Sequence, residues 1–250
     1  MTLRLSLAID AGAIDPSVPT LAFGAPADAA LSPFADLTVV QTFRPDFDAW
    51  AARNIRVTDA ASEAARLSLV FLPRAKPAAR ARVAEAVRLT QGPIVIDGQK
   101  TDGVESLLKD LKQRADVQHV LSKAHGKLAV LAPGADVSDW ADPGPQQSAG
   151  GYWTQPGVFS ADGPDPGSIL LLQGLPAKLG PTVADLGAGW GYLAHAILPD
   201  TSVTTLHLVE AEKRALDCAR LNAPDNRVLF HWADARNWGK TGTIVSVVMN

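Results

Sequence analysis

The sequence has few of the residues that form disulfides or bind metals. Its 250 residues include a single cysteine, Cys218, which excludes an internal disulfide and any cysteine-based metal cluster. The five histidines are scattered without the spacing of metal ligands, so no metal site is expected. Cys218 lies beside leucines in a predicted helix, and we interpret it as a small buried apolar residue.

Long apolar runs and a strong net charge are also missing. No stretch reaches the ~18–20 uninterrupted apolar residues of a membrane span. Asp10 and Asp15 interrupt the apolar N-terminus before a signal peptide could be established. The net charge of −3 argues against a protein that binds nucleic acid over its whole surface. We therefore expect a cytoplasmic protein without a membrane partner.

The charge is nevertheless unevenly distributed. Residues 71–127 contain eleven Lys and Arg against six acids, a net charge of +5 in an otherwise acidic chain. Such a block can be the contact surface for a polyanion. The alternative is a set of solvated helix faces, and charge alone favours that alternative.

Strands and helices alternate along the chain in a pattern typical of a parallel sheet covered on both faces. The first predicted strand is Leu3–Ala8. Prolines and glycines interrupt the pattern at 133–150, which predicts a linker. The expected fold is α/β, with two tandem Rossmann-like units over residues 1–132 and 151–250.

The strongest motif is VADLGAGWGY, in which a predicted strand ends in Asp185 and continues through Gly187, Gly189 and Gly191 into a helix. Glycines permit a sharp turn and let backbone N–H groups approach a ligand closely. The spacing does not fit the dinucleotide-binding fingerprint, because Tyr192 stands where a small residue is required. A phosphate-binding loop is excluded as well, since no Gly-Lys-Ser/Thr follows.

Two further acids follow the next predicted strands. Glu210 ends a strand 25 positions after Asp185, where a carboxylate can accept both hydroxyls of a ribose. Asp234 follows the strand after that and is either a ligand contact or a turn residue. The carboxyl ends of parallel strands meet at one edge of a sheet, so the glycine loop and the three acids predict a ligand site there.

The D-x-G-x-G-x-G motif, together with the segment PGVFS at 156–160, resembles class I S-adenosylmethionine-dependent methyltransferases of the "methyltransferase small" family. Bacterial guanine-N2 methyltransferases of small-subunit ribosomal RNA belong to this family. The resemblance implies that residues 151–250 are the cofactor-binding half of a seven-stranded methyltransferase fold, and that 1–132 are a degenerate copy. The residues it implies for S-adenosylmethionine binding are Phe159, Asp185, Gly187, Gly189, Gly191, Glu210, Asp234 and Ala235.

The same resemblance assigns the catalytic role to Asn250. In the family this strand continues into Asn-Pro-Pro and an aromatic residue, and the Asn holds the amine that receives the methyl group. Positioning of the two reactants supplies much of the rate enhancement in such a transfer. The prolines and the aromatic residue do not follow Asn250, so we expect the 250-residue chain alone to lack the C-terminal part of the domain and to be inactive.

The function implied is methyl transfer to an exocyclic guanine amine of ribosomal RNA, either free or in the small ribosomal subunit. Two alternatives stay open. A protein glutamine methyltransferase uses the same Asn-Pro-Pro motif. A non-catalytic RNA-binding or assembly module on a decayed methyltransferase fold would explain the basic block and the missing aromatic residue.

Overall fold

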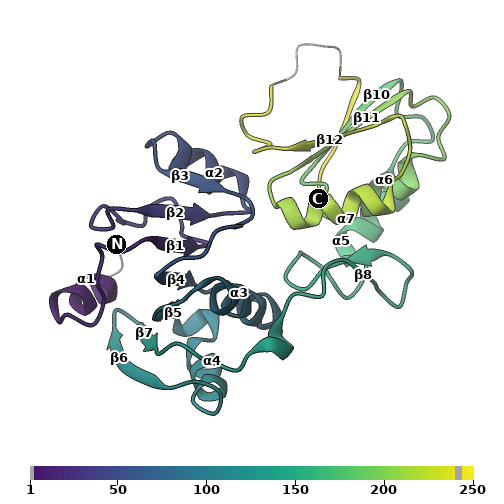
Figure 1. Cartoon of the computed structure of the whole chain (residues 1–250). Helices are drawn as coiled ribbons and strands as arrows, with labels where there is room; N and C mark the ends of the chain where they lie inside the picture. Colours follow the sequence, from purple (N-terminus) through teal and green to yellow (C-terminus); the bar gives the residue numbers. More distant parts are fainter. Residues whose placement is uncertain (1–2, 240–243) are drawn as a thin grey trace. The chain divides into compact units, whose positions relative to one another are not determined.

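The computed structural model describes residues 3–239 and 244–250. The chain divides into two compact units (Figure 1). The N-terminal unit comprises residues 1–42 and 46–142, and the C-terminal unit comprises 43–45 and 143–250. Within the described residues, no helix is long and apolar enough to cross a membrane.

The helices and strands before residue 143 build the N-terminal α/β unit, except that the first two residues of α2 are assigned to the C-terminal unit. They are α1 (Leu3–Asp10), β1 (Thr20–Phe23), β2 (Leu37–Val40), α2 (Arg44–Ala51), β3 (Arg56–Thr58), β4 (Leu67–Phe71), α3 (Lys76–Leu89), β5 (Ile94–Gln99), the 3-10 helix η1 (Lys100–Asp102), α4 (Val104–Leu111), β6 (Val117–Lys123), β7 (Gly126–Leu131) and the 3-10 helix η2 (Ser138–Trp140).

The sheet of the N-terminal unit has seven strands in the order β3-β2-β1-β4-β5-β7-β6. The first five strands of the chain run parallel, whereas β7 is antiparallel to both of its neighbours. All residues of the central strands β1 and β4 are buried, because side chains pack on both faces of the sheet. The apolar residues of α3 and α4 pack on one face, and those of α1 pack on the other.

The prediction of a strand at Leu3–Ala8 is wrong, because these residues form the helix α1. Alternating leucines produced the strand pattern, but the buried residues Arg4, Leu5 and Ala8 follow helical spacing and Leu3 is exposed. Leu5 and Ala8 join the apolar core on one face of the sheet. The partners that select the helix therefore lie far away in the sequence.

The elements after residue 143 form the C-terminal unit. They are β8 (Gln146–Gln147), β9 (Trp153–Thr154), α5 (Pro166–Gly174), β10 (Thr182–Leu186), α6 (Tyr192–Ile197), β11 (Thr205–Glu210), α7 (Lys213–Asn222), β12 (Val228–Trp232) and β13 (Ser246–Val248).

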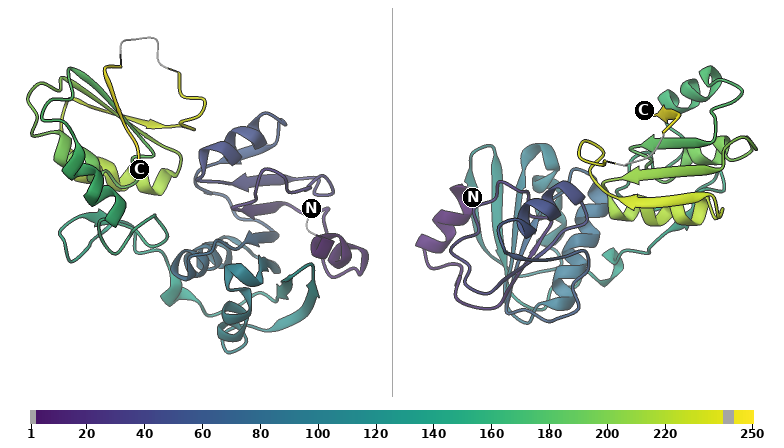
Figure 2. Two further views of the ribbon diagram at one scale, coloured as in Figure 1. Left: turned by 180° about the vertical axis from the view of Figure 1, so that it is seen from behind. Right: turned by 90° about the horizontal axis from the view of Figure 1, so that it is seen from above.

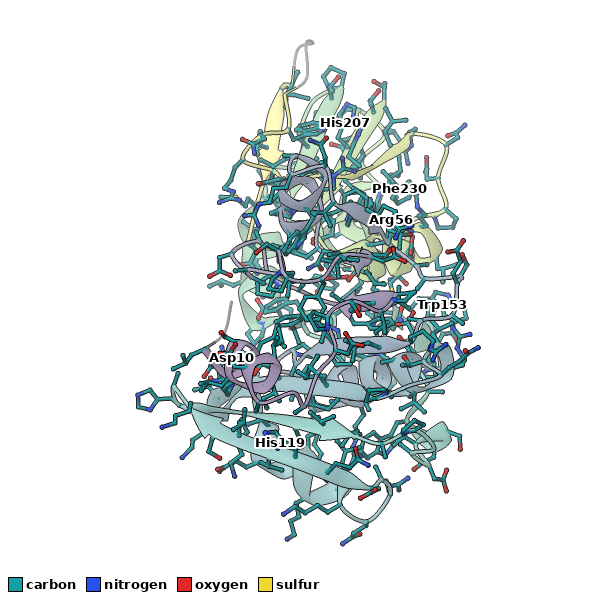
Figure 3. All side chains as sticks on the ribbon, turned by 60° about the vertical axis from the view of Figure 1, so that its left-hand side comes forward. Asp10, Arg56, His119, Trp153, His207 and Phe230 are labelled. Atoms are coloured by element: carbon teal, nitrogen blue, oxygen red, sulfur yellow. The ribbon has the colours of Figure 1, made fainter. Side chains whose placement is uncertain are left out.

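The sheet of the C-terminal unit has four parallel strands in the order β12-β11-β10-β13. This order repeats the β3-β2-β1-β4 part of the N-terminal sheet, which confirms the prediction of two tandem Rossmann-like units. Helices α6 and α7 cover one face of the sheet (Figure 2), where Leu206 and Phe230 belong to the apolar core. His207, labelled in Figure 3, alternates along β11 with Leu206 and Leu208 and so lies on the opposite face, where its Nδ1 is 2.9 Å from Nε2 of His231.

The segment 133–150, expected as a linker, contains η2 and β8. Trp140 of η2 is buried in the N-terminal unit, where the guanidinium groups of Arg80 and Arg114 lie over its ring. The proline- and glycine-rich composition predicted the break in the alternation, and the indole attaches the first part of this segment to the α3 face of the sheet.

Candidate functional site

The glycine loop follows β10 and leads into α6. Positive φ values of 77°, 56° and 87° occur at Gly187, Gly189 and Gly191. Residues with a Cβ adopt such values only at a cost in free energy. A Cβ at Gly187 or Gly189 would meet no atom within 4 Å, so both positions border open space. A Cβ at Gly191 would lie 3.2 Å from that of Ala219, so this glycine permits the close packing of α6 against α7.

Glu210, at the carboxyl end of β11, holds the glycine loop in place. One carboxylate oxygen accepts a hydrogen bond from the backbone N–H of Gly189 at 2.7 Å, and the other accepts one from Glu212 N–H at 2.7 Å. The side chain therefore ties the loop to the turn between β11 and α7. Bonds from N–H groups to an ionised carboxylate are among the stronger hydrogen bonds in proteins.

Asp185 is the acid at the end of β10, and it is fully buried. Neither of its carboxylate oxygens has a hydrogen-bond partner among the described residues. Burial, with a smaller contribution from the negative charge of Glu210, raises the pKa of Asp185 to about 7 from its ordinary 3.8. A buried carboxyl group without a partner is unfavourable unless a donor or a positive charge reaches it.

Asn250 lies in the same pocket as the glycine loop. Its Nδ2 donates to Oδ2 of Asp165 at 2.9 Å and to Oγ of Ser168 at 2.8 Å. Asp165 caps α5 by accepting from Ser168 N–H at 3.1 Å, and the bond from Asn250 is the main cause of a lowered pKa of Asp165. No donor reaches Oδ1 of Asn250 within the part of the chain that the structure describes, so this oxygen can accept a hydrogen bond.

The pocket beside the loop brings together residues from several separate segments. Its lining residues are Phe159, Ser160, Asp165, Ser168, Gly187, Ala188, Gly189, Trp190, Tyr192, Leu193 and Asn250. Phe159 is 70% exposed, so its ring is available to a ligand. Of the sequence-predicted residues, the structure thus places Phe159, Gly187, Gly189 and Asn250 around one hollow, with Asp185 and Glu210 directly attached to its loop.

Asp234 and Ala235 do not line this pocket. The carboxylate of Asp234 accepts from Nη2 of Arg236 at 2.7 Å and from the backbone N–H of the same residue at 2.9 Å. These two bonds lower the pKa of Asp234 and close the turn after β12. The carboxylate therefore stabilises the turn after β12, and the assignment of Asp234 and Ala235 to the cofactor stays a prediction.

Asn222, at the end of α7, is an important contact that the sequence reasoning missed. Its Oδ1 accepts from the backbone N–H of Trp153 at 2.7 Å, and its Nδ2 donates to the carbonyl oxygens of Trp153 and Trp190, each at 2.7 Å. Trp153, labelled in Figure 3, belongs to β9, whereas Trp190 lies in the glycine loop. One carboxamide therefore connects three segments, and no local sequence signal indicates it.

Trp190 packs as a buried residue in this region. Its ring centroid lies 5.0 Å from that of Tyr152 and 5.5 Å from that of Tyr192, and its Nε1 donates to the carbonyl of Ser160 at 3.2 Å. Cys218 is buried in the same cluster, as expected for a small apolar residue. The aromatic cluster supports the loop from the side of α7.

The strand order β12-β11-β10-β13, the glycine loop after β10 and the acid Glu210 at the end of β11 together define a Rossmann-like fold of the methyltransferase class. Residues 150–250 match the family model of the methyltransferase small domain.

Curated relatives and a solved structure agree with this assignment. The chain is 28% identical over 194 residues to the ribosomal RNA small subunit methyltransferase C of Alteromonas mediterranea, covering 73% of this chain and 54% of that protein. It is 31% identical over 173 residues to the protein of the same name from Psychromonas ingrahamii, covering 65% and 50%. The chain thus spans about half the length of these relatives.

The solved structure is the T. thermophilus 16S rRNA N2 G1207 methyltransferase (RsmC) in complex with AdoMet and guanosine. It superimposes with a TM-score of 0.69 at 21% identity, covering 88% of this chain and 66% of that one. At this identity the likeness establishes the fold, and it extends over both units of the chain.

Proposed function

We propose that the C-terminal unit binds S-adenosylmethionine beside the glycine loop. The open space over Gly187 and Gly189 leaves room for a ligand against the backbone. The cofactor carries a positive ammonium and a positive sulfonium group, which suits a loop flanked by the carboxyl groups of Asp185 and Glu210.

We assign the role of holding the substrate amine to Asn250, and this residue carries the proposal. The hydrogen bonds from its Nδ2 to Asp165 and Ser168 orient the carboxamide, whose Oδ1 can accept a hydrogen bond from an amine. An amine whose N–H donates to Oδ1 would direct its lone pair toward the cofactor. When bound, the cofactor supplies an electrophilic methyl group, and the protein contributes position and orientation.

For the substrate we propose the N2 amine of a guanine in small-subunit ribosomal RNA, in the cytoplasm. The support is the name shared by the curated relatives, and the guanosine bound in the structure that superimposes on the chain. The N-terminal unit, with its complete seven-stranded sheet, is proposed as a degenerate methyltransferase domain over residues 1–132, joined to the C-terminal unit through 133–150.

Isothermal titration with S-adenosylmethionine tests the cofactor site. We expect binding by the 250-residue chain and weaker binding by the Asp185→Asn variant, with the exposed Asp162→Asn as the matched control. Asn250→Ala should retain cofactor binding, because the amide is assigned to the amine. Absence of detectable binding to the unmodified chain would refute the proposal.

Transfer of a labelled methyl group tests the substrate. Because we expect the 250-residue chain alone to be inactive, the assay uses a protein in which the family's Pro-Pro-aromatic segment follows Asn250. Digestion of labelled 16S ribosomal RNA to nucleosides should place the label in N2-methylguanosine, and Asn250→Ala should abolish the incorporation. Label recovered in protein glutamine instead would favour the glutamine methyltransferase alternative over the proposed RNA substrate.

A further inference from the structure

The two units carry opposite charges at the same edge of the same fold. In the C-terminal unit, the carboxyl ends of β10, β11 and β12 carry Asp185, Glu210 and Asp234. In the N-terminal unit, a basic residue follows the carboxyl ends of β4 and β5, and another is the last residue of β6. We call Arg74, Lys100 and Lys123, which occupy these three positions, the basic edge. We propose that the basic edge is an RNA-docking surface that contacts phosphates, a proposal that rests on the proposed RNA substrate.

The structure brings Lys100 and Lys123 to the same place. The register pairs Gln99 of β5 with Gly126 of β7, and Gly126 with Lys123 of β6. The backbone N–H of Lys100 donates to the carbonyl of His125 in the β6–β7 turn at 3.0 Å. Two cationic side chains from different segments therefore emerge from one hydrogen-bonded corner of the unit.

The β6–β7 hairpin is anchored from inside the unit. Its two turn residues, Ala124 and His125, have φ values of 48° and 55°, as a tight two-residue turn requires. The guanidinium of Arg4 donates to the carbonyl of Lys123 at 2.8 Å, and its Nε forms a buried ion pair of 2.6 Å with Asp97. The hairpin that carries Lys123 is thus held against β5 before any ligand arrives, which lowers the entropic cost of binding.

Some basic residues of the N-terminal unit form ion pairs with acidic side chains, and others do not. Arg80 pairs with Asp110 at 2.6 Å, and Arg114 pairs with Asp139 at 2.6 Å, so these members of the basic block are largely neutralised. Arg74 and Lys123 are exposed and have no acidic partner among the described residues.

Acidic residues also lie near the basic edge, and they limit the extent of the cationic surface. Oε1 of Glu105 lies 3.1 Å from Nζ of Lys127 and 4.0 Å from Nζ of Lys100, so this carboxylate mainly neutralises Lys127. Asp102 accepts a hydrogen bond from the backbone N–H of Gln99. Asp46 stands near the ends of β1 and β2, and the cationic surface is therefore confined to the β4, β5 and β6–β7 part of the edge.

Fluorescence anisotropy with a labelled RNA stem–loop tests the proposal on the full chain. The edge variant carries Arg74→Gln, Lys100→Gln and Lys123→Gln. The control variant loses the same charge through Arg88→Gln, Lys109→Gln and Lys112→Gln, which are exposed positions in α3, in α4 and directly after α4. Matching the net charge separates a local contact from a general electrostatic effect.

We expect the edge variant to bind RNA about 10²–10³-fold more weakly at ~0.1 M salt, with a salt slope lower by about 2–3. The control variant should stay within a few-fold of the unmodified chain. Equal losses in the two variants, or no RNA binding by the unmodified chain, would overturn the proposal. Thermal melts of both variants should match the unmodified chain, because exposed substitutions alter stability by only about ±0.5 kcal/mol.

Titration with S-adenosylmethionine keeps this test distinct from that of the proposed function. The edge variant should bind the cofactor as the unmodified chain does, because none of its three residues belongs to the C-terminal unit. Cofactor binding with undiminished RNA binding in the edge variant would refute the basic edge alone. If the unmodified chain does not bind the cofactor, the proposed function is refuted instead.

Discussion

Replacing Asp185 by Asn measures the free-energy cost of keeping an unpartnered carboxyl group inside the C-terminal unit. Its pKa is raised to about 7 in the folded protein from an ordinary 3.8. Between about pH 4 and about pH 7 the folded protein therefore keeps a proton that the unfolded chain has released. Because the folded state binds more protons in this window, the free energy of unfolding falls as the pH rises through it.

The magnitude follows from the size of the pKa change. A change of about 3 pKa units corresponds to about 4 kcal/mol over the whole window. Of this, about 2–3 kcal/mol falls between about pH 5 and about pH 8. The carboxamide of Asn does not ionise, so the variant lacks this dependence, although it still buries a polar group at a cost of about 1–3 kcal/mol.

Urea denaturation of the two proteins at about pH 5 and about pH 8 is the assay. Between these pH values the unmodified protein should lose about 2–3 kcal/mol more than the Asp185→Asn variant. The exposed Asp162→Asn variant serves as the control and should follow the unmodified protein. Parallel pH profiles for Asp185→Asn and the unmodified protein would show that the carboxyl group is ionised and satisfied in the fold, contrary to the reasoning above.

Two further predictions concern buried contacts within each unit, one in the N-terminal unit and one in the C-terminal unit. Arg4→Met should destabilise the N-terminal unit by about 3–5 kcal/mol, because it leaves Asp97 buried and unpaired. In thermal melts, the double variant Arg4→Met with Asp97→Leu should recover much of this lost stability. Asn222→Ala should cost about 1–3 kcal/mol in urea denaturation, since it leaves backbone groups of Trp153 and Trp190 unsatisfied, and a variant as stable as the unmodified chain would contradict the role assigned to this carboxamide.

The amino-acid sequence alone determined the features that depend on local pattern. The strands β10 and β11 lie where the sequence predicted strands, before the glycine loop and at Glu210, because each is a short apolar run next to turn residues. The glycine loop was identifiable because the positive φ of its three glycines is a local backbone requirement. The division into two α/β units followed from the proline- and glycine-rich segment that interrupts the alternation.

Only the tertiary structure decided how distant groups use these elements. It made Leu3–Asp10 a helix through burial against the sheet, and it placed Glu210 on Gly189 rather than in solvent. It also buried Asp185 with no hydrogen-bond partner among the described residues, a difference from Glu210 and Asp234 that the strand-end pattern does not predict. The physical reason is that burial and hydrogen-bond satisfaction depend on residues brought together across the fold, which local sequence patterns do not specify.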